Sequence, residues 1–142
     1  KTAAPAPFSG GEIESYLARC AAAVEGAGRK AREEGRWVLG EELGEAAAVL
    51  QTLVARAQTQ PIGDMQETER NLTALEEKLN ASLHRGTPVE VLSQLRAEVD
   101  RGLMPYRRKM SAPEVEMLER RFLRNRLLEQ YKIPRLSLFY VL

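Results

Sequence analysis

Apolar residues recur through most of the chain three and four positions apart, the spacing that places side chains on one face of an α-helix. Polar residues that can cap a helix start, and glycines or prolines that can end one, divide this pattern into five segments. The expected helices span about 9 to 26–35, 37–58, 64–86, 87 to 102–105 and 111–132. The sequence therefore predicts an all-α fold of about five helices, a single domain over residues 9–142 that follows an Ala- and Pro-rich linker at 1–8.

The last helical segment has the clearest start. Ser111, followed by Pro113 and Glu114, is the pattern of a capping box with proline in the first turn. The apolar residues of this helix spread over two arcs, which indicates neighbours on two sides. The third and fourth segments carry narrower stripes and meet at Gly86–Pro88, where Thr87 can serve as an N-cap. We therefore expect the first, second and fifth helices at the centre, with the third and fourth as an antiparallel hairpin.

The chain ends in a stretch without charged side chains, Leu136–Leu142, which follows the helix-ending Pro134. Its residues favour extended structure, and the stretch would be adhesive if it were left in water. Two interpretations are open: the tail folds back onto the helices, or it reaches a partner as an added strand or a captured carboxyl terminus. The residues that would then contact the partner are Leu136, Leu138, Phe139, Tyr140 and Leu142.

A stripe of small residues lies in the second helix at a spacing of four, formed by Gly40, Gly44 and Ala48. Each glycine in a helix interior costs about 1 kcal/mol relative to alanine, so the pair indicates close approach by another backbone. The neighbouring Glu41 and Glu45 exclude a lipid environment for this stripe. The stripe is therefore either a helix crossing or a shallow groove that accepts a partner.

Charge is unevenly distributed along a chain whose net charge is only +1. Residues 1–100 hold 11 Lys and Arg against 16 Asp and Glu, whereas residues 101–142 hold 10 against 4. The two halves can neutralise each other within one chain or between copies. Arg120 and Arg124 project close to an apolar arc, so their stems are expected on packed surface with their charged heads at an edge. A basic end also permits nucleic-acid binding, and its candidate residues are Arg107, Arg108, Lys109 and Arg121.

Residues suited to catalysis or metal binding are scarce. His84, the only histidine, lies at the expected end of the third helix. The only cysteine, Cys20, shares an apolar helical face and is expected to be a buried thiol rather than a reactive one. The sequence contains no phosphate-binding loop, HExxH, CxxC or nucleophile elbow. We therefore expect no enzymatic activity, no metal and no cofactor.

These patterns together favour an interaction protein. A hydrophobic content of 44% and a charged content of 29% are typical of a folded, soluble domain, and no apolar run approaches the roughly 20 residues that span a bilayer. The first residue is Lys1 instead of methionine, which is typical of a fragment of a larger protein or complex. We expect a cytoplasmic adaptor or scaffold domain that binds another protein or a second copy of itself, with nucleic-acid binding as the alternative.

Overall fold

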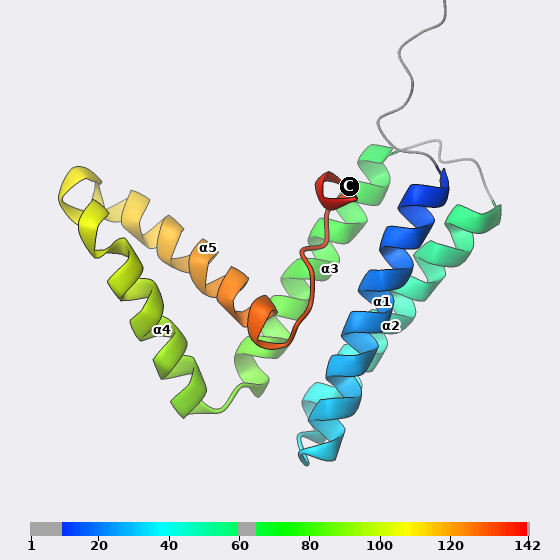
Figure 1. Cartoon of the computed structure of the whole chain (residues 1–142), viewed down its shortest axis with the longest axis horizontal. Helices are drawn as coiled ribbons and strands as arrows, with labels where there is room; N and C mark the ends of the chain where they lie inside the picture. The colour runs from blue at the N-terminus through cyan, green and yellow to red at the C-terminus, as the bar shows by residue number, and fades with distance from the viewer. Residues whose placement is uncertain (1–9, 60–64, 142) are drawn as a thin grey trace, which may run out of the picture.

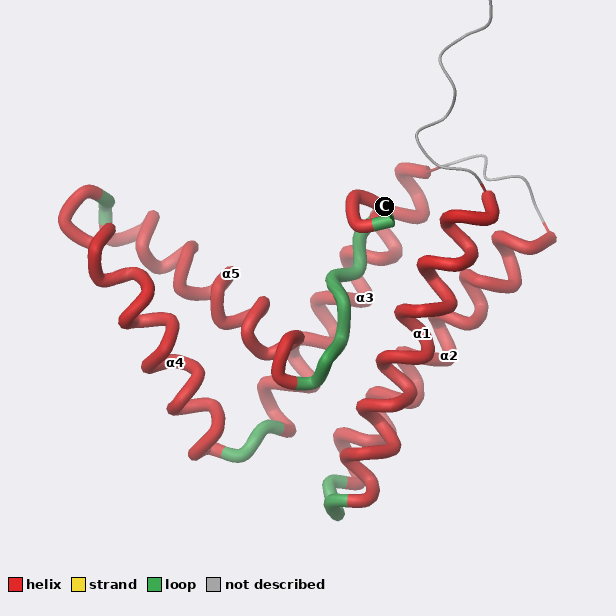
Figure 2. Tube along the Cα trace, viewed as in Figure 1, coloured by secondary structure: helices red, strands yellow, loops and turns green. Residues whose placement is uncertain are grey.

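The computed structural model describes residues 10–59 and 65–141, and every regular element within them is helical (Figure 2). In chain order these elements are α1 (Gly10–Glu33), α2 (Trp37–Thr59), α3 (Met65–Gly86), α4 (Val89–Leu103), the 3-10 helix η1 (Met104–Lys109), α5 (Ala112–Gln130) and the short 3-10 helix η2 (Leu138–Tyr140). Within these ranges the all-α class and the five α-helices expected from the sequence are confirmed. The expected linker at 1–8, the expected helix starts at 9 and 64, and Leu142 lie outside the described residues.

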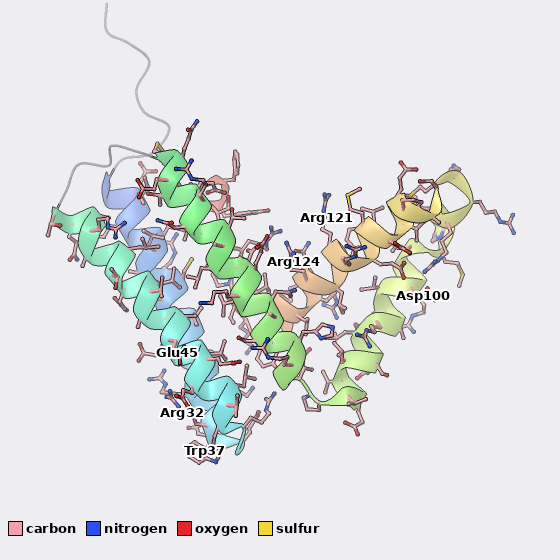
Figure 3. The ribbon with its side chains drawn as sticks, turned by 180° about the vertical axis from the view of Figure 1, so that it is seen from behind. Arg32, Trp37, Glu45, Asp100, Arg121 and Arg124 are labelled. Atoms are coloured by element: carbon pink, nitrogen blue, oxygen red, sulfur yellow. The ribbon has the colours of Figure 1, made fainter. Side chains whose placement is uncertain are left out.

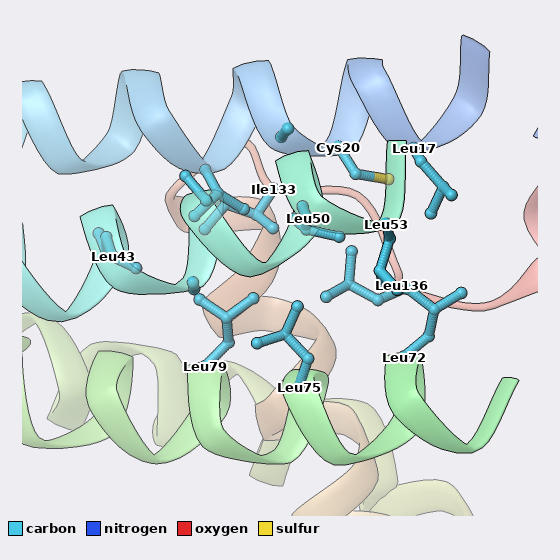
Figure 4. Close-up of a cluster of buried hydrophobic side chains, with 14 of the residues drawn as sticks. Leu17, Cys20, Leu43, Leu50, Leu53, Leu72, Leu75, Leu79, Ile133 and Leu136 are labelled. Atoms are coloured by element: carbon cyan, nitrogen blue, oxygen red, sulfur yellow. The ribbon is translucent and has the colours of Figure 1, made fainter. Parts of the chain in front are cut away.

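The helices α1, α2 and α3 lie side by side and form the body of the molecule (Figure 1). Leucines dominate the core between them, and Leu43, Leu50 and Leu72 are fully buried (Figure 4). The end of the chain closes this core, because Ile133 and Leu136 belong to the same apolar cluster. Burying one leucine side chain stabilises a fold by about 2 kcal/mol, so this cluster is the main source of stability.

The helices α4 and α5 form a second pair that projects from the body (Figure 1). Leu92 and Leu95 of α4 pack with Leu127 of α5 in a small cluster of their own. Leu128, in the last turn of α5, enters the main core and joins the pair to the body. Among the described residues, no helix is long and apolar enough to cross a membrane.

This arrangement corrects the expected grouping of the helices. The third helix of the centre is α3 instead of α5, and α4 packs against α5 instead of α3. The two-sided apolar pattern of α5 suggested two packed faces, but Met117 and Phe122 are exposed. The narrow stripe of α3 suggested one neighbour, yet this helix contacts α2, α5 and the end of the chain.

The helices α1 and α2 cross where their glycines face each other. A Cβ atom built on Gly28 would lie 3.3 Å from the carbonyl oxygen of Gly40, and one built on Gly40 would lie 2.5 Å from Cγ of Arg32. The Arg32 guanidinium also donates a hydrogen bond of 3.2 Å to that carbonyl. The stripe at Gly40 and Gly44 is therefore a crossing within the chain. The helix α1 runs unbroken through this region, and the chain reverses at Gly35, whose φ of +80° suits glycine.

The predicted helix caps are confirmed at one site and corrected at another. The Ser111 hydroxyl accepts a hydrogen bond of 3.3 Å from the Glu114 N–H, and the Glu114 carboxylate accepts one of 2.9 Å from the Ser111 N–H. Thr87, by contrast, does not cap α4, because its hydroxyl donates to the Leu83 carbonyl at 2.5 Å. The same hydroxyl lies 2.8 Å from that of Tyr131. Thr87 is thus a buried link between α3 and the end of α5.

Cys20 is fully buried in α1, as the sequence predicted. Burial raises the pKa of its thiol from 9.0 to about 11. Between these values the unfolded chain loses the proton first, so the free energy of unfolding falls as pH rises, by about 2 kcal/mol from this group between pH 9 and 11. Urea unfolding at several pH values checks this, with Cys20→Ala as the control that lacks the group. An equal pH dependence in the two proteins would contradict it.

Candidate docking groove

Residues 133–141, here named the C-terminal segment, run alongside α1 and α3 and are fixed by polar contacts to both helices (Figure 1). The Tyr16 hydroxyl of α1 donates to the Arg135 carbonyl and accepts a hydrogen bond of 3.0 Å from the Ser137 N–H. Glu69 of α3 accepts hydrogen bonds from the Ser137 hydroxyl at 2.6 Å and from the Leu138 N–H at 2.8 Å. The segment therefore folds back onto the body, the first of the two interpretations that the sequence left open.

Glu76 of α3 is the buried acid at the centre of these contacts. Its two oxygens accept hydrogen bonds of 2.9 and 3.2 Å from the Arg135 guanidinium, and one of them accepts a further bond of 2.8 Å from the Leu136 N–H. Asn125 of α5 accepts from the same guanidinium at 3.1 Å. The hydrogen bonds to Glu76 raise the pKa of Arg135 above its ordinary value. Arg135 consequently links the end of the chain to both α3 and α5.

The C-terminal segment divides its side chains between the core and the surface. Leu136, Leu138 and Val141 are buried in the main core, so they are structural and not part of an exposed docking surface. Phe139 is 86% exposed, and the ring of Tyr140 lies 5.5 Å from the Arg135 guanidinium carbon in a cation–π contact. Of the tail residues named from the sequence, Phe139 and Tyr140 are exposed, and Leu142 lies outside the described residues.

A basic groove separates this segment from α5. It has a volume of about 700 Å³ and is lined by Met117, Arg120, Arg121, Arg124, Asn125, Arg135 and Tyr140. The residues from α5 recur three and four positions apart, which places them along one side of the helix. Figure 3 shows Arg121 and Arg124 on the side of α5 where the angle between that helix and α3 opens. We name this site the docking groove.

The four arginines of the docking groove differ in whether an acidic side chain pairs with them. Arg135 pairs with Glu76, and Arg120 lies 3.7 Å from Glu116 one helical turn away. Arg121 and Arg124 have no acidic side chain within 4.0 Å among the described residues. The Nε of Arg124 is moreover shielded from solvent without a hydrogen-bond acceptor in that part of the chain. Two guanidinium groups in the groove are therefore available to an anionic ligand.

The other basic residues singled out from the sequence lie elsewhere. Arg107 is paired with Asp100 and lies 3.7 Å from Glu119, so its charge is already compensated. Arg108 and Lys109 are exposed on η1, at the far end of the α4–α5 pair from the body (Figure 1). The expected basic surface is thus split, since Arg121 alone of the four candidates lines the docking groove.

Three further residues singled out from the sequence, His84, Gly40 and Gly44, contact other parts of the same chain. His84 lies with its Nε2 3.1 Å from the Arg96 guanidinium and has no metal-ligating cluster around it, and none occurs elsewhere in the described residues. Gly40 is buried beneath Arg32 in the α1–α2 crossing. Gly44 lies under the same side chain, because a Cβ atom built there would be 2.9 Å from its guanidinium. Neither glycine offers an open groove to a partner.

Sequence reasoning found the parts of the docking groove but did not assemble them. The expectation that the stem of Arg120 lies on packed surface is wrong, because its side chain is 81% exposed. Arg124 is half-buried, but its Nε is shielded from solvent instead of lying at an edge. The contribution of Arg135 and Tyr140 depends on the folding back of the C-terminal segment, which no local spacing specifies. The sequence signal that could have indicated the groove is the repeat of arginines beside Met117 on a single side of α5.

Comparison with known proteins gives no further assignment. The chain matches no described protein family, no curated protein and no solved structure.

Proposed function

We propose that this chain is a non-enzymatic protein-interaction domain, an adaptor or scaffold module, and that its docking groove binds an acidic segment of a protein partner. The observation that carries this proposal is that Arg121 and Arg124 line a groove and have no acidic side chain within 4.0 Å over residues 10–59 and 65–141. Arginine beside carboxylates forms strong, often bidentate hydrogen bonds.

The rim of the groove favours a protein as the occupant. Met117 is 55% exposed and lines the groove, while Phe139 extends into solvent from the segment that forms its other wall. Methionine, aromatic residues and arginine are the residue types enriched where proteins bind each other. A segment that offers carboxylates to the arginines and apolar side chains to this rim has the matching chemistry.

Reversing the charge of Arg121 and Arg124 together is expected to abolish this binding. The probe is a fluorescent amphipathic peptide of Glu, Leu and Ala, titrated with the full chain at low ionic strength. Arg121→Glu with Arg124→Glu should weaken binding by about a hundredfold, since about 1.4 kcal/mol for each arginine is tenfold in affinity. The exposed Arg121 changed alone should give about tenfold, which keeps the test informative if the double variant folds poorly.

A matched control uses exposed arginines away from the groove, Arg29→Glu with Arg70→Glu, which should bind the peptide as the unmodified chain does. Added salt should weaken the wild-type complex, because it screens exposed charges. Equal affinities for the groove variant and the control would contradict the proposal. So would preferential binding of single-stranded or duplex DNA or of RNA that is lost in Arg108→Ala with Lys109→Ala, the result expected of the nucleic-acid alternative.

A further inference from the structure

The outward face of α2 carries a stripe of acidic and apolar side chains. Glu41, Glu45 and Val49 follow one another at a spacing of four, which aligns them along the helix. Both glutamates are exposed, and neither has a basic side chain within 4.0 Å among residues 10–59 and 65–141. Val49 is 46% exposed. Glu45 and Val49 also line a shallow cleft of about 280 Å³ beside α3, which gives room for an incoming side chain.

The acidic and apolar side chains of this stripe are complementary to the basic and apolar side chains of the docking groove. Along α5 the groove presents Met117, Arg121 and Arg124 at spacings of four and three. If α2 of another molecule lies antiparallel to α5, Glu41 falls opposite Arg124 and Glu45 falls opposite Arg121. The same register brings Val49 opposite Met117. One alignment therefore pairs two charges and one apolar contact, whereas the parallel alignment sets Glu41 against Met117.

We propose that the docking groove of one molecule receives the Glu41–Val49 face of α2 from a second copy of the chain. This inference rests on the proposed function, because it names the acidic segment that the groove binds. Within one molecule the contact cannot form, since α3 lies between Glu45 and Arg121 (Figure 3). The two surfaces are different, so a one-way contact extends into chains or closes into rings, whereas a reciprocal contact closes as a two-fold dimer.

Sedimentation of the full chain over a range of concentrations at low ionic strength tests this contact. The average mass of the wild-type chain should rise with concentration and fall again when salt is added. Glu41→Lys with Glu45→Lys, and separately Arg121→Glu with Arg124→Glu, should each shift association to roughly tenfold or more higher concentration. An equimolar mixture of these two variants should associate again, because each supplies the charge that the other has lost.

Glu25→Lys with Glu77→Lys is the matched control, since both residues are exposed on other helices and should leave association unchanged. Circular dichroism and thermal melting establish that each variant is folded. A wild-type chain that stays monomeric, or a mixture that fails to associate, would overturn the inference. If the acidic peptide still binds wild type and not the groove variant, the proposed function stands and the self-contact alone has failed.

Discussion

Replacing Glu76 with alanine is expected to lower the free energy of unfolding by about 3 kcal/mol, the cost of leaving one partner of a buried ion pair unpaired. Glu76 is 5% exposed and receives both arms of the Arg135 guanidinium together with the Leu136 N–H. Its loss leaves three donors without their acceptor at the point where the end of the chain meets the body. Thermal and urea unfolding measure the change, which corresponds to a Tm lower by about 10 °C.

The neighbouring Glu77 supplies the matched control. It is exposed on α3 and points away from Glu76 by about 100° around the helix axis. Glu77→Ala should change the free energy of unfolding by less than about 0.5 kcal/mol, as exposed substitutions usually do. Equal effects of the two substitutions would show that the C-terminal segment is not anchored by Glu76.

Introducing leucine at Gly28 is expected to destabilise the body by about 3 kcal/mol, the upper range for overpacking a well-filled contact. The added Cβ would meet the Gly40 carbonyl oxygen and the Leu43 Cβ, each at 3.3 Å. The first of these is backbone and cannot rotate away. The remaining leucine atoms have no room unless α1 and α2 separate, which urea unfolding would detect as a lower midpoint.

Gly26 is the internal comparison, because it lies in the same helix only half a turn away. A Cβ atom there would approach nothing closer than the Arg29 guanidinium at 3.8 Å. Gly26→Ala should therefore stabilise the chain by up to about 1 kcal/mol through helix propensity alone. Opposite signs at the two glycines are expected from the crossing, and a stabilised Gly28→Leu variant would contradict it.

The helices could be predicted from the sequence, but only part of their packing could. Local signals such as the Ser111 capping box and the turn at Gly86–Pro88 depend on neighbouring residues, and they placed helix boundaries well. The pairing of the helices depends on how much apolar surface is buried between segments that are far apart in the sequence. The end of the chain packs on α3 beside α5, and Leu136 and Leu138 bring apolar area there together with hydrogen-bonded backbone.

The docking groove shows the same limit. The spacing of Arg120, Arg121 and Arg124 is local and could be read directly. Their ion pairing is not local, because Arg135 pairs with Glu76 across 59 positions of sequence, while Arg121 has no acidic side chain within 4.0 Å in the part of the chain that the structure describes. Thr87 does not cap α4 because its hydroxyl donates to the Leu83 carbonyl. The hydroxyl of Tyr131, 44 positions later, lies 2.8 Å from the same group, a contact that no local spacing specifies.

Residue-specific NMR of the full chain, titrated with the acidic Glu-, Leu- and Ala-containing peptide, tests directly whether the peptide binds in the docking groove. We expect amide signals to shift along α5 near residues 117–125 and in the C-terminal segment near 135–140, the two walls of the docking groove. Signals at the α1–α2 crossing should remain in place. Shifts confined to η1, around Arg108 and Lys109, or spread evenly over the surface, would contradict the docking groove as the binding site.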